Sequence, residues 1–120
     1  MEDKRRRRNL EGFVKGDVVV VPFPFTDMTC SKKRPAIVLA SFNDGSVILA
    51  QITSQAWIDD YSVIINKNDF EHGTLKVTSI ARPNKIFTAD KSLILYKAGA
   101  IKHKKMAEVK KRLKKIFLEE

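Results

Sequence analysis

The sequence predicts a mainly β domain: a small antiparallel barrel or sandwich of roughly five to seven short strands, followed by one α-helix. Short apolar runs rich in β-branched residues recur between turn signals over residues 16–88, and this stretch shows no helical period. Residues 103–120 instead have apolar side chains spaced three and four apart, as in an amphipathic helix. A length of 120 residues fits one domain with a single core.

The first strand is predicted in GDVVVVPFPF, residues 16–25. Its four consecutive valines favour a strand that is buried on both faces or twisted into a small barrel. Pro22 and Pro24 have no amide donor, so the chain must leave the ladder there or run along an edge. The second strand is predicted in PAIVLAS, residues 35–41, after a connection formed by residues 25–34.

The next strands follow a clear turn signal. Asn-Asp-Gly at residues 43–45 predicts a hairpin between the second strand and SVILAQIT, residues 46–53. Further short strands are predicted in YSVIINK (61–67), TLKVTSIARP (74–83) and NKIFT (84–88).

The C-terminal helix is predicted at about residues 103–118, and we expect it to cap the barrel. Its apolar stripe consists of Met106, Val109, Leu113, Ile116 and Phe117. Its other face is expected to be solvated and includes Lys105, Lys111, Arg112 and Lys115. Residues 13–120 would form the folded domain. Residues 1–12 would be a basic, flexible extension, because they contain four consecutive arginines and almost no apolar anchor.

Several classes of protein and site are excluded by what the sequence lacks. No apolar run approaches the roughly 18 residues that span a bilayer, and we expect no secretory signal, because no apolar stretch of that kind follows the N-terminal cations. Cys30 is the single cysteine, which agrees with a reducing compartment, so we expect a cytoplasmic protein. Cys30, His72 and His103 do not have the spacing of zinc ligands, and neither a nucleophile elbow nor a Walker loop occurs. No metal or cofactor is therefore expected.

The formal net charge is +9, and most of it lies near the two ends of the chain. Residues 1–15 contain six Lys or Arg and three acidic residues, and residues 102–120 contain eight and three. Residues 16–101 are nearly neutral, with nine cations and eight acids. A cationic cluster inside this neutral part is therefore more informative than the basic ends, and it suggests an anionic partner.

Such a cluster is formed by Lys32, Lys33 and Arg34, which directly precede Pro35 at the start of the predicted second strand. The arginine guanidinium is a planar, charged set of donors that matches phosphate oxygens. Pro35 disfavours the helical region for the residue before it, so Arg34 should be presented at the strand entrance with little backbone freedom. By itself, this arrangement favours a charged strand edge on the surface over a catalytic site.

Four ordered segments, GDVVVVPFPFTD, SKKRPAIVL, QITSQ and IARPNKIFTADKSLI, resemble the MazF/PemK-like toxins of type II toxin-antitoxin systems. The resemblance implies an SH3-like barrel with a C-terminal helix, a homodimer, and sequence-specific, metal-independent cleavage of single-stranded RNA. Attack by the neighbouring 2′-hydroxyl would leave 2′,3′-cyclic phosphate and 5′-hydroxyl ends. The resemblance also implies a cognate antitoxin protein that occupies the RNA groove, no membrane, and contact with DNA through the antitoxin complex alone.

On the matching segments, Arg34 corresponds to the essential arginine of the family and Thr53 to its essential threonine, so both are predicted to be catalytic. Arg34 would stabilise the phosphorane, and Thr53 would donate a hydrogen bond to a non-bridging oxygen. A catalytic aspartate in one branch of the family falls near Asn84; asparagine cannot act as a base, so the general base is unassigned. RNA binding is predicted for Ser31, Lys32, Lys33, Ser54, Gln55 and Arg82.

Other functions stay open at this point. The main alternative is a nucleic-acid-binding barrel that does not cut, with Phe23, Phe25 and Trp57 as base-stacking side chains. Another is an inactive toxin relative that acts as a co-repressor with an antitoxin. His72 and His103 have suitable chemistry for proton transfer near neutral pH but lie in no matching motif, so surface positions are expected for them.

Overall fold

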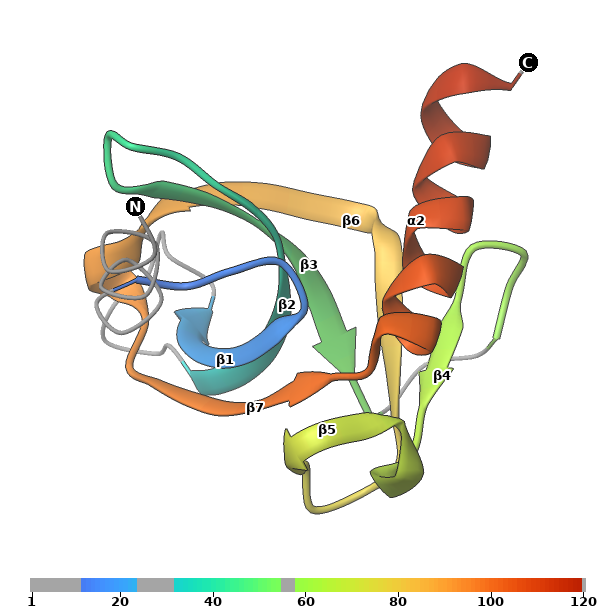
Figure 1. Ribbon diagram of the computed structural model, residues 1–120, viewed down its shortest axis with the longest axis horizontal. Helices are drawn as coiled ribbons and strands as arrows, with labels where there is room; N and C mark the ends of the chain where they lie inside the picture. The colour runs from blue at the N-terminus through green and yellow to red at the C-terminus, as the bar shows by residue number, and fades with distance from the viewer. Residues whose placement is uncertain (1–11, 24–31, 55–57, 120) are drawn as a thin grey trace.

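The computed structural model describes residues 12–23, 32–54 and 58–119. These residues form strands, two 3₁₀ turns and a C-terminal helix (Figure 1). The elements are β1 (Asp17–Phe23), β2 (Lys32–Ser41), β3 (Ser46–Thr53), β4 (Val63–Ile65), η1 (Lys67–Asp69), β5 (Phe70–Gly73), β6 (Ser79–Asp90), η2 (Lys91–Leu93), β7 (Tyr96–Ile101) and α2 (His103–Leu118).

The seven strands form one antiparallel sheet in the order β4-β6-β3-β2-β1-β7-β5. The sheet curls strongly, so that the described residues make a half-barrel with α2 beside β6 (Figure 1). The short strands β4 and β5 are its two edges. The predicted fold class, a small antiparallel barrel with a C-terminal helix, is confirmed.

The valines of β1 are buried on both faces of the sheet, as the sequence predicts. Val18 belongs to the apolar cluster that α2 covers, together with Ile37 and Val109. Val19 and Val21 belong to a second cluster on the opposite face. The curl of the sheet allows both faces to be enclosed by one short chain.

Two local signals in the sequence have the expected effect. The turn at residues 43–45 connects β2 to β3, with Gly45 at a φ of +92° and its amide donating to the carbonyl of Phe42 at 3.1 Å. Pro22 lies where β1 still pairs with β2, but beyond the last pairing of β1 with β7 at Val20. The missing amide donor of Pro22 therefore falls at a local edge of the sheet.

Helix α2 has the predicted bounds, but it covers the sheet only in part. Met106 and Val109 are buried, and Leu113 packs at the edge of the same cluster. The C-terminal turns extend past the sheet (Figure 1), and Phe117 is 63% exposed. The predicted helix therefore covers the barrel with Met106, Val109 and Leu113, while Phe117 of the predicted stripe is mostly exposed.

Three further expectations are corrected by the structure. Lys32, Lys33 and Arg34 do not end a loop of residues 25–34; they form the start of β2 and pair with Phe23, Pro22 and Val21. Pairing with β1 extends the strand past the proline that the sequence suggested as its first residue. The connection between the two strands is therefore confined to residues 24–31, which lie outside the described residues.

The other two corrections concern the second half of the sheet. Residues 79–90 form the single strand β6, although Pro83 suggested a break between two strands. A register shift accommodates Pro83, because Ala50 pairs with Ile86 while Gln51 pairs with Arg82. Residues 74–78 are not part of a strand, whereas β5 and β7 were not predicted.

Candidate functional site

A cleft of about 570 Å³ lies where β2 begins and β3 ends. Its floor contains a row of residues from four neighbouring strands. Val20 of β1 pairs with Tyr96 of β7 on one side and with Pro35 of β2 on the other. The register of β2 with β3, continued from the pair of Ala36 with Gln51, places Pro35 opposite Ile52. All four residues of this row (Tyr96, Val20, Pro35 and Ile52) line the cleft.

Beside this floor, the loop of residues 74–77 between β5 and β6 forms a wall of the cleft. Gly73 ends β5 with a φ of +72°, and a Cβ at this position would overlap the carbonyl oxygen of Ala98 in β7. Only glycine therefore permits this close approach of β5 to β7. The approach places the loop that follows Gly73 across the cleft from β2 and β3.

Arg34 and Thr53 come together in this cleft. One step beyond Pro35 and Ile52, past Ala36–Gln51 as the last pair of the β2–β3 ladder, the continued register brings Arg34 opposite Thr53 on one face of the sheet. Both residues line the cleft and are partly buried. No described residue forms a hydrogen bond or ion pair with the Arg34 side chain. The guanidinium is thus available to an anionic ligand beside a hydroxyl group.

The predicted RNA-binding residues divide into those that line this cleft and those that do not. Lys33 and Ser54 line it, next to the two predicted catalytic residues. Lys32 is exposed in β2 but does not line the cleft. The following residues singled out from the sequence lie outside the described residues: Phe25, Cys30, Ser31, Gln55 and Trp57.

Arg82 does not line the cleft and has a protein partner. It pairs with Gln51 in the sheet, and its Nη2 lies 3.1 Å from Oδ2 of Asp59. Its side chain is 11% exposed, and its Nε is buried without a hydrogen-bond partner. Hydrogen bonds from the Ser62 hydroxyl and from the Tyr61 amide, with the charge of Arg82, hold the pKa of Asp59 below its ordinary value. Asp59 therefore stays ionised beside Arg82 and is a weak proton acceptor at neutral pH.

Neither histidine lies in the cleft. His72 is exposed in β5, and His103 is exposed at the first residue of α2. Asn84 is exposed in the irregular part of β6 and does not line the cleft either. None of the described residues that line the cleft is thus a histidine or a carboxylate that could act as the general base.

Three charged or aromatic residues of the cleft were missed by the sequence interpretation: Lys76, Tyr96 and Lys97. Lys97 in β7 forms an ion pair with Asp17, with Nζ 3.2 Å from Oδ1. Asp17 is buried and also accepts a hydrogen bond from the amide of Val14 at 2.9 Å. The apolar run SLILYKAGAI was the available signal for β7, but it shows no clear alternation of polar and apolar residues.

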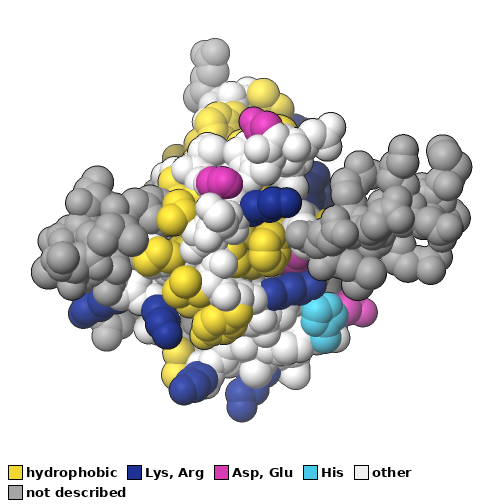
Figure 2. All heavy atoms as spheres, turned by 90° about the vertical axis from the view of Figure 1, so that its left-hand side faces the viewer, with side chains coloured by type: hydrophobic (Ala, Val, Ile, Leu, Met, Phe, Trp, Pro, Cys, Tyr) yellow, Lys and Arg dark blue, Asp and Glu magenta, His cyan; other side chains and the backbone are white. Residues whose placement is uncertain are grey.

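The described part of the cleft wall is cationic. It includes Lys33, Arg34, Lys76 and Lys97 and no carboxylate. Of these four, Lys97 alone has an ion-pair partner among the described residues. Figure 2 shows the side of the molecule at the left of Figure 1, where apolar side chains lie among Lys and Arg side chains and a few acidic ones. Donors of this kind around an apolar floor suit a ligand with phosphate groups and flat, partly apolar bases.

The described residues contain no group of three or more His, Cys, Asp or Glu side chains placed to hold a metal ion. The described helix is also too short and too polar to cross a membrane.

Comparison with known proteins agrees with this fold. The structure is similar to MazF from Deinococcus radiodurans, with a TM-score of 0.67 and 21% identity over 86% of this chain and 94% of that chain. It is similar to the MazE-MazF structure from the same organism, with a TM-score of 0.69, 20% identity and the same coverage. An endoribonuclease in complex with its cognate antitoxin from Mycobacterial species gives a TM-score of 0.66 and 15% identity over 84% of this chain and 90% of that chain. A comparison with curated protein sequences finds no match.

The sequence itself decides the family. Residues 14–117, most of the chain, match the family described as the PemK-like, MazF-like toxin of type II toxin-antitoxin systems. This range includes the cleft, every described strand and all of α2 except Leu118. The chain therefore belongs to the PemK-like, MazF-like toxin family.

Proposed function

We propose that this protein is the toxin of a type II toxin-antitoxin pair and cleaves single-stranded RNA in the cleft between β2, β3 and the loop of residues 74–77. The observation that supports this most directly is that Arg34 and Thr53 line one cationic cleft, each two residues beyond the last pair of the β2–β3 ladder, Ala36 with Gln51. Membership of the toxin family and the likeness to proteins described as endoribonucleases agree with it. The proposed place of action is the cytoplasm.

The proposed reaction is attack by the 2′-hydroxyl on the adjacent phosphate. The 2′-oxygen loses its proton and bonds to phosphorus, while the bond from phosphorus to the 5′-oxygen breaks and the leaving oxygen takes up a proton. The products are a 2′,3′-cyclic phosphate and a 5′-hydroxyl. No metal ion takes part in this proposal.

Arg34 and Thr53 would act on the phosphate during this reaction. The two N–H groups of the guanidinium edge would donate to the non-bridging oxygens as negative charge develops on the phosphorane. The Thr53 hydroxyl would donate to one of the same oxygens. Arg34 has no described protein partner, so this binding does not require it to give up a contact. Lys33 and Ser54 would bind phosphates next to the cut site; the roles of Ser31, Lys32, Gln55 and Arg82 stay predictions.

The proposed partner is an antitoxin with an acidic segment that covers the cations of the cleft and excludes RNA. Similar structures are described as complexes of this type, including MazE-MazF and an endoribonuclease with its cognate antitoxin. Affinity should fall at high salt, because exposed charges are screened within about 8 Å at physiological ionic strength. We further propose a homodimer built from residues 13–120, with residues 1–12 as a basic extension. A monomer by light scattering at micromolar concentration would count against this assembly.

The deciding experiment is incubation of the protein with a long RNA in the presence of EDTA. We expect fragments with 5′-hydroxyl ends, and no cleavage of an otherwise identical substrate that has 2′-deoxyribose at the cut site. Cleavage of the deoxy substrate would mean that water or a protein group is the nucleophile. Tight RNA binding without cleavage, with normal growth when the protein is expressed alone, would show instead that it is a binding module.

A further inference from the structure

One aromatic residue of the cleft has no part in the proposed reaction. Tyr96, the first residue of β7, lines the cleft and is 54% exposed. Its partner in the sheet is Val20, which is 6% exposed. A large aromatic side chain is thus left partly uncovered next to the apolar floor of a cleft. Tyrosine in this setting has a ring to stack on and a hydroxyl that can stay in water.

The position of Tyr96 at one end of the cleft floor favours a nucleotide beside the one that reacts. Tyr96 and Ile52 are at opposite ends of the four-strand row on the cleft floor, and Thr53 follows Ile52. Neighbouring strands lie about 4.8 Å apart, so the path along the sheet from Tyr96 to Ile52 is roughly 14 Å. A base on Tyr96 would therefore belong to a nucleotide that flanks the cut site.

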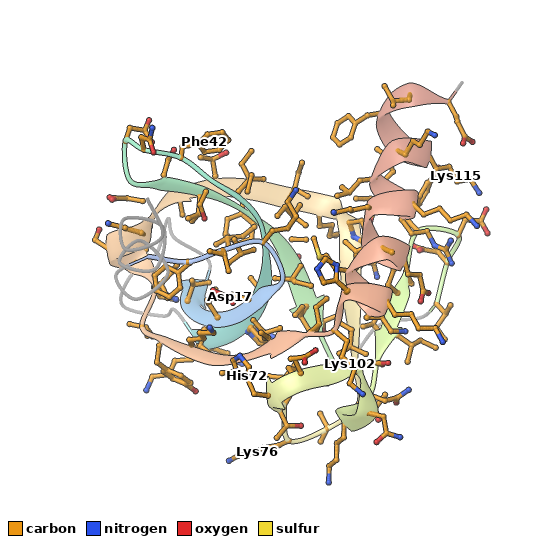
Figure 3. The ribbon with its side chains drawn as sticks, viewed as in Figure 1. Asp17, Phe42, His72, Lys76, Lys102 and Lys115 are labelled. Carbon is orange, nitrogen blue, oxygen red and sulfur yellow. The ribbon has the colours of Figure 1, made fainter. Side chains whose placement is uncertain are left out.

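A cation without a partner among the described residues lies in the loop that leaves β5 where Gly73 pairs with Gly99 of β7. Lys76 is exposed in the loop between β5 and β6, and Figure 3 shows its side chain extending outward from that loop. It lines the cleft and has no ion pair or hydrogen bond with a described residue. Lys97, next to Tyr96, is instead paired with Asp17. Lys76 is therefore the available charge for a phosphate at this end.

We propose that Tyr96 is the stacking platform for the base of one nucleotide flanking the cut site, and that Lys76 binds a phosphate of that nucleotide. The inference rests on the proposed function, because it assigns part of the same RNA path. Stacking accepts any base, since every base has a π face. This end of the cleft would thus add affinity and correct alignment of the RNA, with a modest preference for bases that stack strongly.

The first test compares cleavage by matched variants. Cut sites of the wild-type protein are mapped on a long RNA, and a short oligonucleotide around one site becomes the substrate. Tyr96→Leu should lower kcat/KM by roughly 5- to 150-fold, the range expected when one base loses its aromatic partner. Tyr96→Phe keeps the ring and should stay within about three-fold of wild type. Phe42→Leu is the control, because Phe42 is 50% exposed on the β2–β3 turn and does not line the cleft.

The second test identifies the base that Tyr96 contacts. The oligonucleotide is remade with one abasic nucleotide at each flanking position in turn. With the wild-type protein, an abasic nucleotide at one of these positions should lower kcat/KM as much as Tyr96→Leu does. With the Tyr96→Leu variant, the abasic nucleotide at that position should cause no further loss. Independent, additive losses at every position would overturn the stacking assignment.

The third test concerns Lys76. Binding is measured as a function of salt on the same oligonucleotide with 2′-deoxyribose at the cut site. Lys76→Gln should make the slope of log affinity against log salt shallower by about 0.7, the value for one phosphate contact with a single strand. Lys110→Gln, a change of an exposed lysine on α2, should leave the slope unchanged. An unchanged slope for Lys76→Gln would remove Lys76 from the RNA path.

Failure of this inference is distinguishable from failure of the proposed function. If the wild-type protein does not cut RNA, the proposed function is wrong. If it cuts and Tyr96→Leu cuts equally fast, the base platform alone is wrong. Light scattering completes the test: a change of mass in Tyr96→Leu would mean that Tyr96 is a contact between subunits, and it would also overturn the inference.

Discussion

The cleft and helix α2 are both rich in cations, but they differ in what surrounds the charges. In the cleft, Arg34 and Lys33 lie next to hydroxyl groups and an apolar floor, and neither has a described partner. Helix α2 has seven Lys or Arg and one glutamate, but its exposed lysines point into solvent, as Figure 3 shows for Lys115. Charges in a partly enclosed site interact more strongly with a ligand than solvated charges do. The surroundings of the charges, more than their number, therefore distinguish the candidate site from the helix.

The largest effect is expected from Arg34. Arg34→Ala should lower the cleavage rate by about 10² to 10³ with the fold intact, the usual cost of losing one strong oxyanion donor. Arg34→Lys should recover only part of the rate, because a point charge cannot reproduce two parallel N–H donors. Single-turnover cleavage and circular dichroism would measure both properties. Lys111→Ala on α2 is the control; if it slowed cleavage as much as Arg34→Ala, the contrast between the two regions would be lost.

Thr53 should show the next largest effect. Thr53→Ala removes the hydroxyl opposite Arg34 and should slow cleavage by about 10². Thr53→Ser keeps the hydroxyl and should retain most of the rate. The same single-turnover assay distinguishes the two variants. Equal loss in both would show that the methyl group matters through packing and that Thr53 is not a hydrogen-bond donor to the phosphate.

Helix α2 is expected to contribute little to the cleavage of RNA. Replacing Lys110, Lys111, Lys114 and Lys115 together by glutamine should change kcat/KM by less than about three-fold near physiological salt, where solvated charges are screened. At low salt the association rate should fall, because long-range attraction of RNA is reduced. Stopped-flow binding at several salt concentrations would measure this. A loss above ten-fold at physiological salt would place α2 in the RNA site.

The sequence predicts those parts of the fold whose signals are local. The four valines of β1, the turn at Gly45 and the apolar spacing in α2 each depend on neighbours within a few residues. In contrast, β7 is held by pairing with β1 and with β5, which are distant in the sequence. Such strands are decided by tertiary context more than by propensity.

The same distinction applies to the site. Arg34 and Thr53 were predicted from the resemblance to a family, and the structure brings them into one cleft. Tyr96 and Lys76 join that cleft through β7 and through the loop after Gly73. Their position depends on a close contact between β5 and β7, which no local sequence pattern indicates. The side of the cleft that contains Arg34 and Thr53 could thus be predicted from the sequence. The side that contains Tyr96 and Lys76 could be identified only from the structure.

Arg82 represents a third environment for a cation, because it has a carboxylate partner. The folded-state pKa of Asp59 is lowered from 3.8, so the stability that its ionised form contributes is present above pH 3.8. That contribution is lost as the pH falls through the lower, folded-state pKa. Asp59→Asn should therefore lower the melting temperature slightly and by the same amount at pH 7 and pH 5.

The difference in melting temperature between Asp59→Asn and wild type should shrink below pH 3.8. Differential scanning calorimetry at a series of pH values would measure this difference. Asp44→Asn is the matched control. Ser46 lowers the pKa of Asp44 through hydrogen bonds, and Arg82 is not among the causes. Added salt should reduce the effect of Asp59→Asn more than that of Asp44→Asn, because only Asp59 interacts with a neighbouring charge. Equal salt sensitivity would mean that the ion pair with Arg82 contributes nothing to stability. The hydrogen bonds from Ser62 and Tyr61 would then be the interactions through which Asp59 acts.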